Sequence, residues 1–392
     1  MRIGILTGGG DCPGLNAVIR GATRAAEVTY DSTVIGFRNA WRGVMDNDYE
    51  ILDVDRCRGI LPLGGTILGT SRDQPFAQED GLKRVRKAYD RHGLDAIIGI
   101  GGEGSMGVVN RLHEHGFPVI GVPKTIDNDI SLTEMTFGFQ TAVQICTDAI
   151  DRLHTTAESH HRVLVVEVMG RHVGHIAVWS GLAGGAAIIL TPEEAFDIDE
   201  VCERIVHRHK KGRFATIVVV AEGAVPKEGT IDIPAPEVDK YGHQILGGIG
   251  SILAREIQGR TGIESRMTAL GHIQRGGSPV AFDRVLGTRF GVAAVEAAID
   301  GAWGQMVALQ QGHIERVPVA EAISHLKMVE PELLRLNSMF QPRIPGDEHP
   351  GLPGEEQHEQ HGLPGEASPE HRVDTRAGIA TDHHVPDVPV EH

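Results

Sequence analysis

Two short segments combine residue types that suit phosphoryl transfer. Residues 101–105 read Gly-Gly-Glu-Gly-Ser, and residues 123–129 read Pro-Lys-Thr-Ile-Asp-Asn-Asp. A glycine turn lets backbone N–H groups approach phosphate oxygens, and aspartates such as Asp127 and Asp129 can hold Mg²⁺ or accept a proton. Helix capping would explain one of these aspartates but not the glycine turn that precedes them. The two segments together therefore predict chemistry on a phosphoryl group.

A third glycine-rich segment, residues 8–16, reads Gly-Gly-Gly-Asp-Cys-Pro-Gly-Leu-Asn. It stands between a predicted strand and a predicted helix, where glycines and a helix N-terminus could bind phosphate. The segment has neither the Walker pattern nor the spacing of a dinucleotide fingerprint. Taken alone, it fits a tight structural turn and a phosphate-binding turn equally well.

The elements that must position these residues follow an α/β pattern. Short apolar segments alternate with helix-length amphipathic segments as far as about residue 311. We predict strands at residues 3–7, 96–100, 119–122, 163–168, 186–190, 215–221 and 267–270. Glycine-rich or polar residues follow strand after strand, and ligands of parallel sheets bind beyond the carboxyl ends of the strands. We therefore expect a parallel α/β fold with the site at these strand ends.

The amino-acid composition limits the kinds of partner that the protein is expected to bind. The chain of 392 residues carries a net charge of -16, which opposes long-range attraction to nucleic acid or to anionic membranes. We expect small phosphate-bearing partners, no nucleic acid and no membrane. The four cysteines form no close pair, and the chain opens on a strand-like segment without a leader pattern. The expected location is the cytoplasm.

The composition changes near the C-terminus. Proline, glutamate and histidine accumulate from residue 341, and we predict a disordered acidic tail over residues 341–392. Residues 223–248 are interpreted as an insertion that includes a surface loop at 226–236.

The ordered motifs resemble those of the 6-phosphofructokinase family over roughly residues 1–320. They are residues 8–16, 101–105, 123–129, Met169-Gly170-Arg171, and 271–279 (Gly-His-Ile-Gln-Arg-Gly-Gly-Ser-Pro). The resemblance implies transfer of a phosphoryl group to the 1-hydroxyl of fructose 6-phosphate. It also implies two Rossmann-like three-layer α/β lobes with a cleft between them. The nucleotide and Mg²⁺ lobe would comprise 1–138 and 275–305, and the sugar-phosphate lobe 139–274 and 306–340.

The resemblance also implies roles for individual residues. Asp127 is expected to be the general base, with Thr125 beside it and Arg171 stabilising the transferring group. Mg²⁺ would be held or oriented by Glu103 and Asp129, although many members of the family have aspartate where this chain has Glu103. The donor site would comprise Gly10, Arg72, Gly102, Glu103, Gly104 and Ser105. The sugar-phosphate site would comprise Thr125, Asp127, Arg162, Met169, Gly170, Arg171, Glu222, Arg266, His272 and Arg275.

Subunit sharing is a further implication of the resemblance. In the family, the arginines that correspond to Arg162 and Arg266 reach the substrate of a neighbouring subunit. A homo-oligomer is therefore expected, usually a tetramer.

Two positions of the resemblance point to different phosphoryl donors. ATP users of the family typically have glycine at both positions, whereas pyrophosphate users have aspartate and then lysine. This chain has Gly104 and Lys124. Because Gly104 leaves room for the α-phosphate, we expect ATP as the donor, with pyrophosphate as the alternative.

The sequence disfavours two other kinds of protein. NAD kinases and lipid kinases also contain a Gly-Gly-acid-Gly turn, but the sugar-phosphate motifs at 169–171 and 272–275 argue against them. A non-catalytic nucleotide or sugar-phosphate sensor is disfavoured because Asp127 and Asp129 are both retained.

Overall fold

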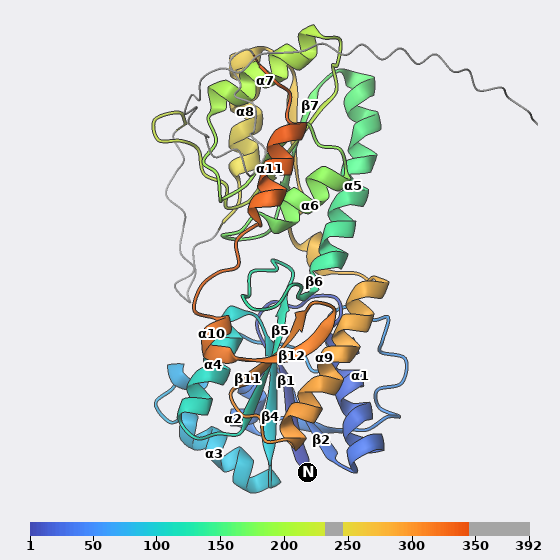
Figure 1. The fold of residues 1–392 in the computed structure, drawn as a ribbon, viewed down its shortest axis with the longest axis vertical. Coiled ribbons are helices and arrows are strands. Elements are labelled where there is room, and N and C mark those ends of the chain that lie inside the picture. The colour runs from blue at the N-terminus through green and yellow to red at the C-terminus, as the bar shows by residue number, and fades with distance from the viewer. Residues whose placement is uncertain (232–245, 345–392) are drawn as a thin grey trace, which may run out of the picture. The chain divides into compact units, whose positions relative to one another are not determined.

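Two β-sheets with helices on both faces make up the described part of the chain, which comprises residues 1–231 and 246–344 of a computed structural model (Figure 1). The mixed α/β fold with parallel strands is confirmed. Most of the predicted tail, residues 345–392, and residues 232–245 of the predicted insertion lie outside the described residues. None of the described helices is long and apolar enough to cross a membrane.

The first sheet has the strand order β12-β11-β5-β4-β1-β2-β3, and β6 pairs with β5 beside this path. Its three central strands, β5, β4 and β1, are parallel and almost wholly buried, as expected for strands covered by helices on both faces. The strands are β1 (Arg2–Thr7), β2 (Thr33–Phe37), β3 (Tyr49–Leu52), β4 (Ala96–Gly101), β5 (Val119–Thr125), β6 (Phe137–Gly138), β11 (Gln305–Gln310) and β12 (His313–Pro318).

Helices cover both faces of this sheet. Alternate strand residues enter opposite hydrophobic clusters: Ile3 and Ile5 pack with α1 and α9, whereas Leu6 packs with α2, α3 and α4. A Cβ on Gly291 of α9 would lie 2.3 Å from the carbonyl oxygen of Val18, so glycine permits the close approach of α9 to α1. The helical elements are α1 (Leu15–Arg24), η1 (Ala25–Thr29), α2 (Trp41–Asp46), η2 (Pro75–Ala77), α3 (Gly81–His92), α4 (Glu103–Glu114), α9 (Ala281–Ile299) and α10 (Val319–Ala322).

The second sheet is wholly parallel, with the order β10-β7-β9-β8. One face packs against α7 and α8, and the other against α5 and α6. Its elements are α5 (Phe139–His160), β7 (Val163–Val168), α6 (His175–Ala183), β8 (Ile188–Leu190), α7 (Ile198–Lys210), β9 (Thr216–Ala221), α8 (Ile249–Thr261), β10 (Ser265–Ala269), η3 (Gly271–Arg275) and α11 (Pro331–Phe340).

The N-termini of α5 and α9 cap each other. The buried carboxylate of Asp283 accepts hydrogen bonds from the backbone N–H and the hydroxyl of Thr141, at 2.8 and 2.6 Å. The same hydroxyl accepts from the backbone N–H of Val280 at 3.0 Å. Burial raises the pKa of Asp283. Two orphan helix-end donors are thereby satisfied by a pair of side chains far apart in the sequence.

The predicted boundary at residue 306 was wrong in one respect. Strands β11 and β12 lie in the first sheet, whereas residues 306–340 were expected in the second lobe. Met306 pairs with Gly121 of β5, and β12 returns antiparallel to β11. Beyond this hairpin, α11 reaches the second sheet, where Asn337 donates to the carbonyl oxygen of Ile189 at 3.2 Å.

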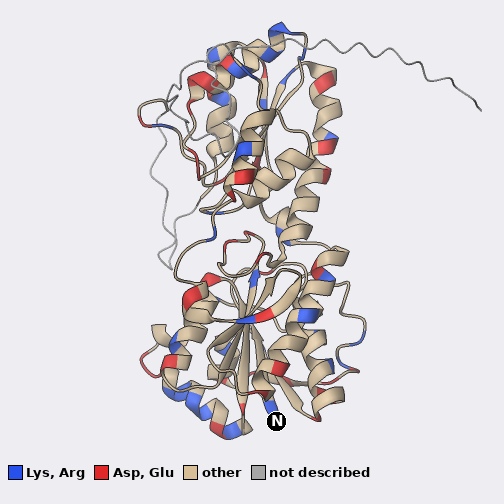
Figure 2. Cartoon of the chain, in the orientation of Figure 1, with Lys and Arg blue, Asp and Glu red and all other residues tan. Residues whose placement is uncertain are grey.

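Charged side chains lie mainly on helices and loops, and the interior strands are almost free of them (Figure 2). Lys124 on β5 and Glu167 on β7 are buried exceptions. Burying a charged group costs free energy unless hydrogen bonds or opposite charges compensate it. Both residues are therefore expected to belong to the site or to support it.

Candidate active site

The three glycine-rich or acidic segments meet because they follow neighbouring parallel strands, β1, β4 and β5. The backbone N–H of Gly8 donates to the carbonyl oxygen of Ile100 at 2.8 Å. A Cβ on Gly8 would lie 2.8 Å from Ser105 Oγ, and one on Gly101 would lie 2.2 Å from Ser105 Cβ. Glycine at both positions therefore lets the first turn of α4 pack against the turn after β1.

Lys124 extends into the same turn from the end of β5. The side chain is buried, and Nζ donates a hydrogen bond to the carbonyl oxygen of Gly10. Burial lowers the pKa of Lys124, whereas the carboxyl groups of Asp127 and Asp129 favour its charged form. A cation thus lies within the glycine turn where a phosphate is expected.

Asp127 and Asp129 supply open acceptors. Among the described residues, Oδ1 of each aspartate is buried without a hydrogen-bond partner. Burial raises the pKa of both groups, and for Asp129 the charge of Asp127 adds to the effect and brings the pKa to about 7. The backbone N–H of Asp127 donates to Thr125 Oγ1 at 3.0 Å.

These carboxylates fit a hard cation. Mg²⁺ in phosphoryl-transfer sites is typically bound by one or two carboxylates, with phosphate and water completing the octahedron. The described residues contain no group of three His, Cys, Asp or Glu side chains that could form a full cage. Asp129 is half-buried, and Glu103, the other expected metal residue, is exposed at the start of α4.

The Arg171 loop lies at the end of β7 in a constrained conformation. Gly170 has φ 142° and Arg171 has φ 54°, a left-handed value that is uncommon for a residue with a side chain. Glu222 Oε1 accepts from the backbone N–H of Arg171 at 3.1 Å. Arg275, Arg171 and Lys124 all lower the pKa of Asp127 against the effect of burial. The fold therefore places three cationic side chains from separate segments around the expected base.

Arg275 contacts the turn that was expected to bind the donor. A Cβ on Gly10 would lie 2.6 Å from Arg275 Nη1, which also donates to the carbonyl oxygen of Asp11 at 3.4 Å. The structure thus brings together Arg275, expected on the sugar-phosphate side, and Gly10, expected on the donor side. Arg72 is exposed and follows Ser71, whose carbonyl oxygen accepts from the backbone N–H of Gly9 at 3.2 Å.

Gln274 is a supporting residue that the sequence interpretation missed. It is fully buried, and its Oε1 accepts from the backbone N–H of Met169 at 3.2 Å and from Cys146 Sγ at 3.1 Å. Its Nε2 donates to the carbonyl oxygen of Gly271 at 3.0 Å. Gln274 therefore joins the end of β7 to the turn that carries the exposed side chain of His272.

Within one chain, Arg162 and Arg266 lie away from the residues around Asp127. They stand at the starts of β7 and β10, and both pair with Glu264, at 3.2 and 2.6 Å. Arg171 follows the far end of β7, and a strand of six residues spans roughly 20 Å. The two arginines thus lie at the amino ends of β7 and β10, whereas Arg171 follows the carboxyl end of β7.

Sequence comparison identifies the family. A family model described as phosphofructokinase matches residues 2–298. The chain belongs to the phosphofructokinase family. A relative from Streptomyces coelicolor named pyrophosphate–fructose 6-phosphate 1-phosphotransferase is 56% identical over 87% of this chain and 99% of its own length. A second relative from the same organism, named ATP-dependent 6-phosphofructokinase 3, is 54% identical over 84% of this chain and 96% of its own.

Solved phosphofructokinases share the fold. The Pichia pastoris phosphofructokinase in its T-state aligns with 86% of this chain at 30% identity and a TM-score of 0.74, and this chain spans 36% of that longer chain. A pyrophosphate-dependent phosphofructokinase from Nitrosospira multiformis aligns over 90% of this chain and 95% of its own, with 21% identity and a TM-score of 0.74. The latter comparison supports the fold alone. Relatives named for either donor have similar identity to this chain, so family membership leaves the donor open.

Proposed function

We propose that this phosphofructokinase transfers a phosphoryl group from ATP to the 1-hydroxyl of fructose 6-phosphate, giving fructose 1,6-bisphosphate and ADP. The observation that carries the proposal is the environment of Asp127. Within the described parts of the chain, its Oδ1 is buried without a hydrogen-bond partner in the loop after β5, and the charges of Arg275, Arg171 and Lys124 lower its pKa against the effect of burial.

In the proposed step, the 1-hydroxyl oxygen attacks the γ-phosphorus and the bond to the β–γ bridging oxygen breaks. Asp127 accepts the hydroxyl proton, for which its raised pKa makes it a stronger base than an ordinary aspartate. Arg171 stabilises the charge on the transferring group. Mg²⁺, when bound, neutralises the donor's phosphates, and Asp129 and Glu103 would hold or orient it.

The environment of Gly104 supports ATP as the donor. A Cβ at this position would meet no heavy atom of the described residues within 4 Å, so the first turn of α4 leaves open space beside the turn that follows β4. The α-phosphate and nucleoside of ATP need such space, whereas pyrophosphate has neither.

Pyrophosphate remains a second candidate because Lys124 is buried with its ammonium group at the carbonyl oxygen of Gly10. The experiment compares kcat/KM for ATP and for pyrophosphate, each with Mg²⁺ and saturating fructose 6-phosphate. We expect the larger value with ATP. Turnover with pyrophosphate but not with ATP would replace the proposed donor and leave the acceptor chemistry intact.

Replacement of Asp127 tests the proposed base. Asp127→Ser should lower kcat by at least ~10²-fold, the usual scale of general acid–base catalysis. Binding of fructose 6-phosphate, measured by calorimetry, should remain close to that of the wild type. Undiminished turnover would remove Asp127 from the mechanism.

We further propose a cytoplasmic homotetramer in which Arg162 and Arg266 complete a neighbouring subunit's site. Their place at the amino ends of β7 and β10, away from Arg171, supports this assignment. Hybrids formed from inactive Arg162→Ser and Asp127→Ser chains should regain activity, because some sites would then receive a wild-type residue from each subunit. Hybrids that form, by light scattering and native mass spectrometry, yet stay inactive would contradict it.

A further inference from the structure

A connecting segment joins the loop of the expected base to the elements beside Arg171. This segment, the strap, comprises residues 322–330 and runs from the end of α10 to the start of α11. Its first half lies against the loop that follows β5. The backbone N–H of Ser131 donates to the carbonyl oxygen of Ala322 at 3.2 Å, and Ser131 Oγ donates to that of His325 at 2.9 Å.

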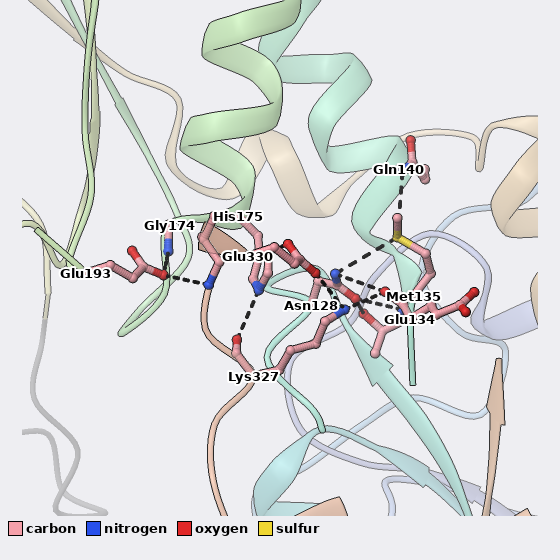
Figure 3. A network of polar contacts seen from close by, with 11 residues as sticks. Asn128, Glu134, Met135, Gln140, Gly174, His175, Glu193, Lys327 and Glu330 are labelled. Atoms are coloured by element: carbon pink, nitrogen blue, oxygen red, sulfur yellow. Dashed lines mark hydrogen bonds and ion pairs between the residues drawn. The ribbon is translucent and has the colours of Figure 1, made fainter. Parts of the chain in front are cut away.

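The second half of the strap contacts the elements that follow Arg171 (Figure 3). Glu193 Oε1 accepts from the backbone N–H of Gly174 at 2.9 Å and from that of Val329 at 3.2 Å. Gly174 is the N-cap of α6, three residues beyond Arg171. One carboxylate oxygen therefore links the strap to the end of the Arg171 loop.

Lys327 is the point at which both sets of contacts meet. Its backbone N–H donates to the carbonyl oxygen of Asp129 at 3.0 Å. Its own carbonyl oxygen lies 3.0 Å from Nε2 of His175, and its Nζ donates to the carbonyl oxygen of Glu134 (Figure 3). The backbone of a single residue thus bridges the loop that carries the aspartates and the first residue of α6.

On α6, the contact with Lys327 is made by the side chain of His175. It is fully buried, and its ring packs edge-on against Phe139 with the centroids 6.2 Å apart. Burial lowers the pKa of His175, which favours the neutral ring. Because a carbonyl oxygen can only accept, the Nε2 that contacts Lys327 carries the proton.

We propose that His175 is a positioning residue for phosphoryl transfer. Through Lys327, it holds the loop of Asp127 and Asp129 in register with the Arg171 loop. The inference rests on the proposed function, because it assumes that Asp127 and Arg171 act on the same phosphoryl group. A shift of about 1 Å between catalytic groups can cost ~10²-fold in rate. A strap anchored on both sides limits such shifts.

Two replacements separate this role from simple core packing. His175→Gln retains a side-chain N–H donor for the carbonyl oxygen of Lys327, whereas His175→Phe retains an aromatic ring without one. We expect Phe to lower kcat by about 10-fold or more, with KM for fructose 6-phosphate changed by less than about threefold. For His175→Gln, log kcat should lie at least halfway from the value of His175→Phe towards that of the wild type. A packing role would instead favour Phe over Gln, and that order would overturn the proposal.

Kinetics must be normalised to folded protein, measured by circular dichroism and thermal unfolding. Should His175→Phe fail to fold, Ser131→Ala tests the same strap from its other side, because it removes only the hydroxyl that donates to His325. The expected result is again a lower kcat with little change in KM, and an unchanged kcat would count against the strap.

Asp127→Ser, assayed in parallel, keeps the two proposals apart. If Asp127→Ser is inactive and the strap variants have normal kcat values, only the positioning role fails. If Asp127→Ser is fully active, the proposed base itself fails.

Discussion

The donor can be tested at Gly104 by adding a negative charge where the α-phosphate of ATP would lie. Gly104 is exposed in the first turn of α4 and does not have a left-handed backbone, and among the residues that the structure describes no heavy atom would lie within 4 Å of a Cβ there. Aspartate is also favourable near a helix N-terminus and has a better helix propensity than glycine. Gly104→Asp should therefore fold at least as well as the wild type.

The expected loss follows from Coulomb's law. Two unit charges about 4 Å apart repel by about 4 kcal/mol at an effective dielectric constant of 20. Because the position is exposed, we halve this value to about 2 kcal/mol for solvent and salt screening. That energy corresponds to a roughly 30-fold lower kcat/KM for ATP. Pyrophosphate has no α-phosphate and no nucleoside, so any turnover with it should be unaffected.

Gly104→Asn is the matched control, because asparagine has nearly the same size without the charge. Initial rates would be measured with each donor at saturating fructose 6-phosphate and at two ionic strengths. We expect Asn to lose less ATP activity than Asp, and added salt to narrow the gap between them. An Asp variant whose kcat/KM for ATP stays within about threefold of wild type would refute the placement of the α-phosphate beside Gly104.

Three further predictions concern the supports of the site. Gln274→Leu should raise KM for fructose 6-phosphate more than KM for the donor, because the turn that carries His272 loses its hydrogen bond to the end of β7. Equal changes in the two steady-state KM values would contradict this. Gly223→Ala would place a Cβ 1.8 Å from the carbonyl oxygen of Arg171, and should lower kcat by at least ~10-fold, whereas Gly259→Ala, with nothing within 4 Å, should not. Burial raises the pKa of Asp283 above its ordinary 3.8, so the folded state binds the carboxyl proton more tightly than the unfolded state does. The contribution of Asp283 to the free energy of unfolding therefore falls as pH rises above that value. Asp283→Asn should therefore flatten this part of the thermal-unfolding profile, and an unchanged pH profile of Tm would argue against the buried acid.

Much of the fold was predictable because its signals are local. The predicted strands at 3–7, 96–100 and 119–122 correspond to β1, β4 and β5, since buried parallel strands have nearly continuous apolar sequences. Strands β2, β3, β11 and β12 were not predicted. Met306 pairs with β5 from nearly 190 residues away, and no local pattern indicates such a pairing. The assignment of residues 306–340 to the second lobe failed at the β11–β12 hairpin for the same reason.

The sequence by itself determined which residues could do the chemistry and which strand ends carry them. Asp127, Lys124 and the glycine turns lie together because the strands that precede them are neighbours in one parallel sheet. Only the tertiary structure placed Arg275 against Gly10, Gln274 beneath Met169 and Lys327 between Asp129 and His175. Each of these contacts joins residues more than 100 positions apart, so its energy arises from burial and hydrogen bonding that exist only after the chain has folded.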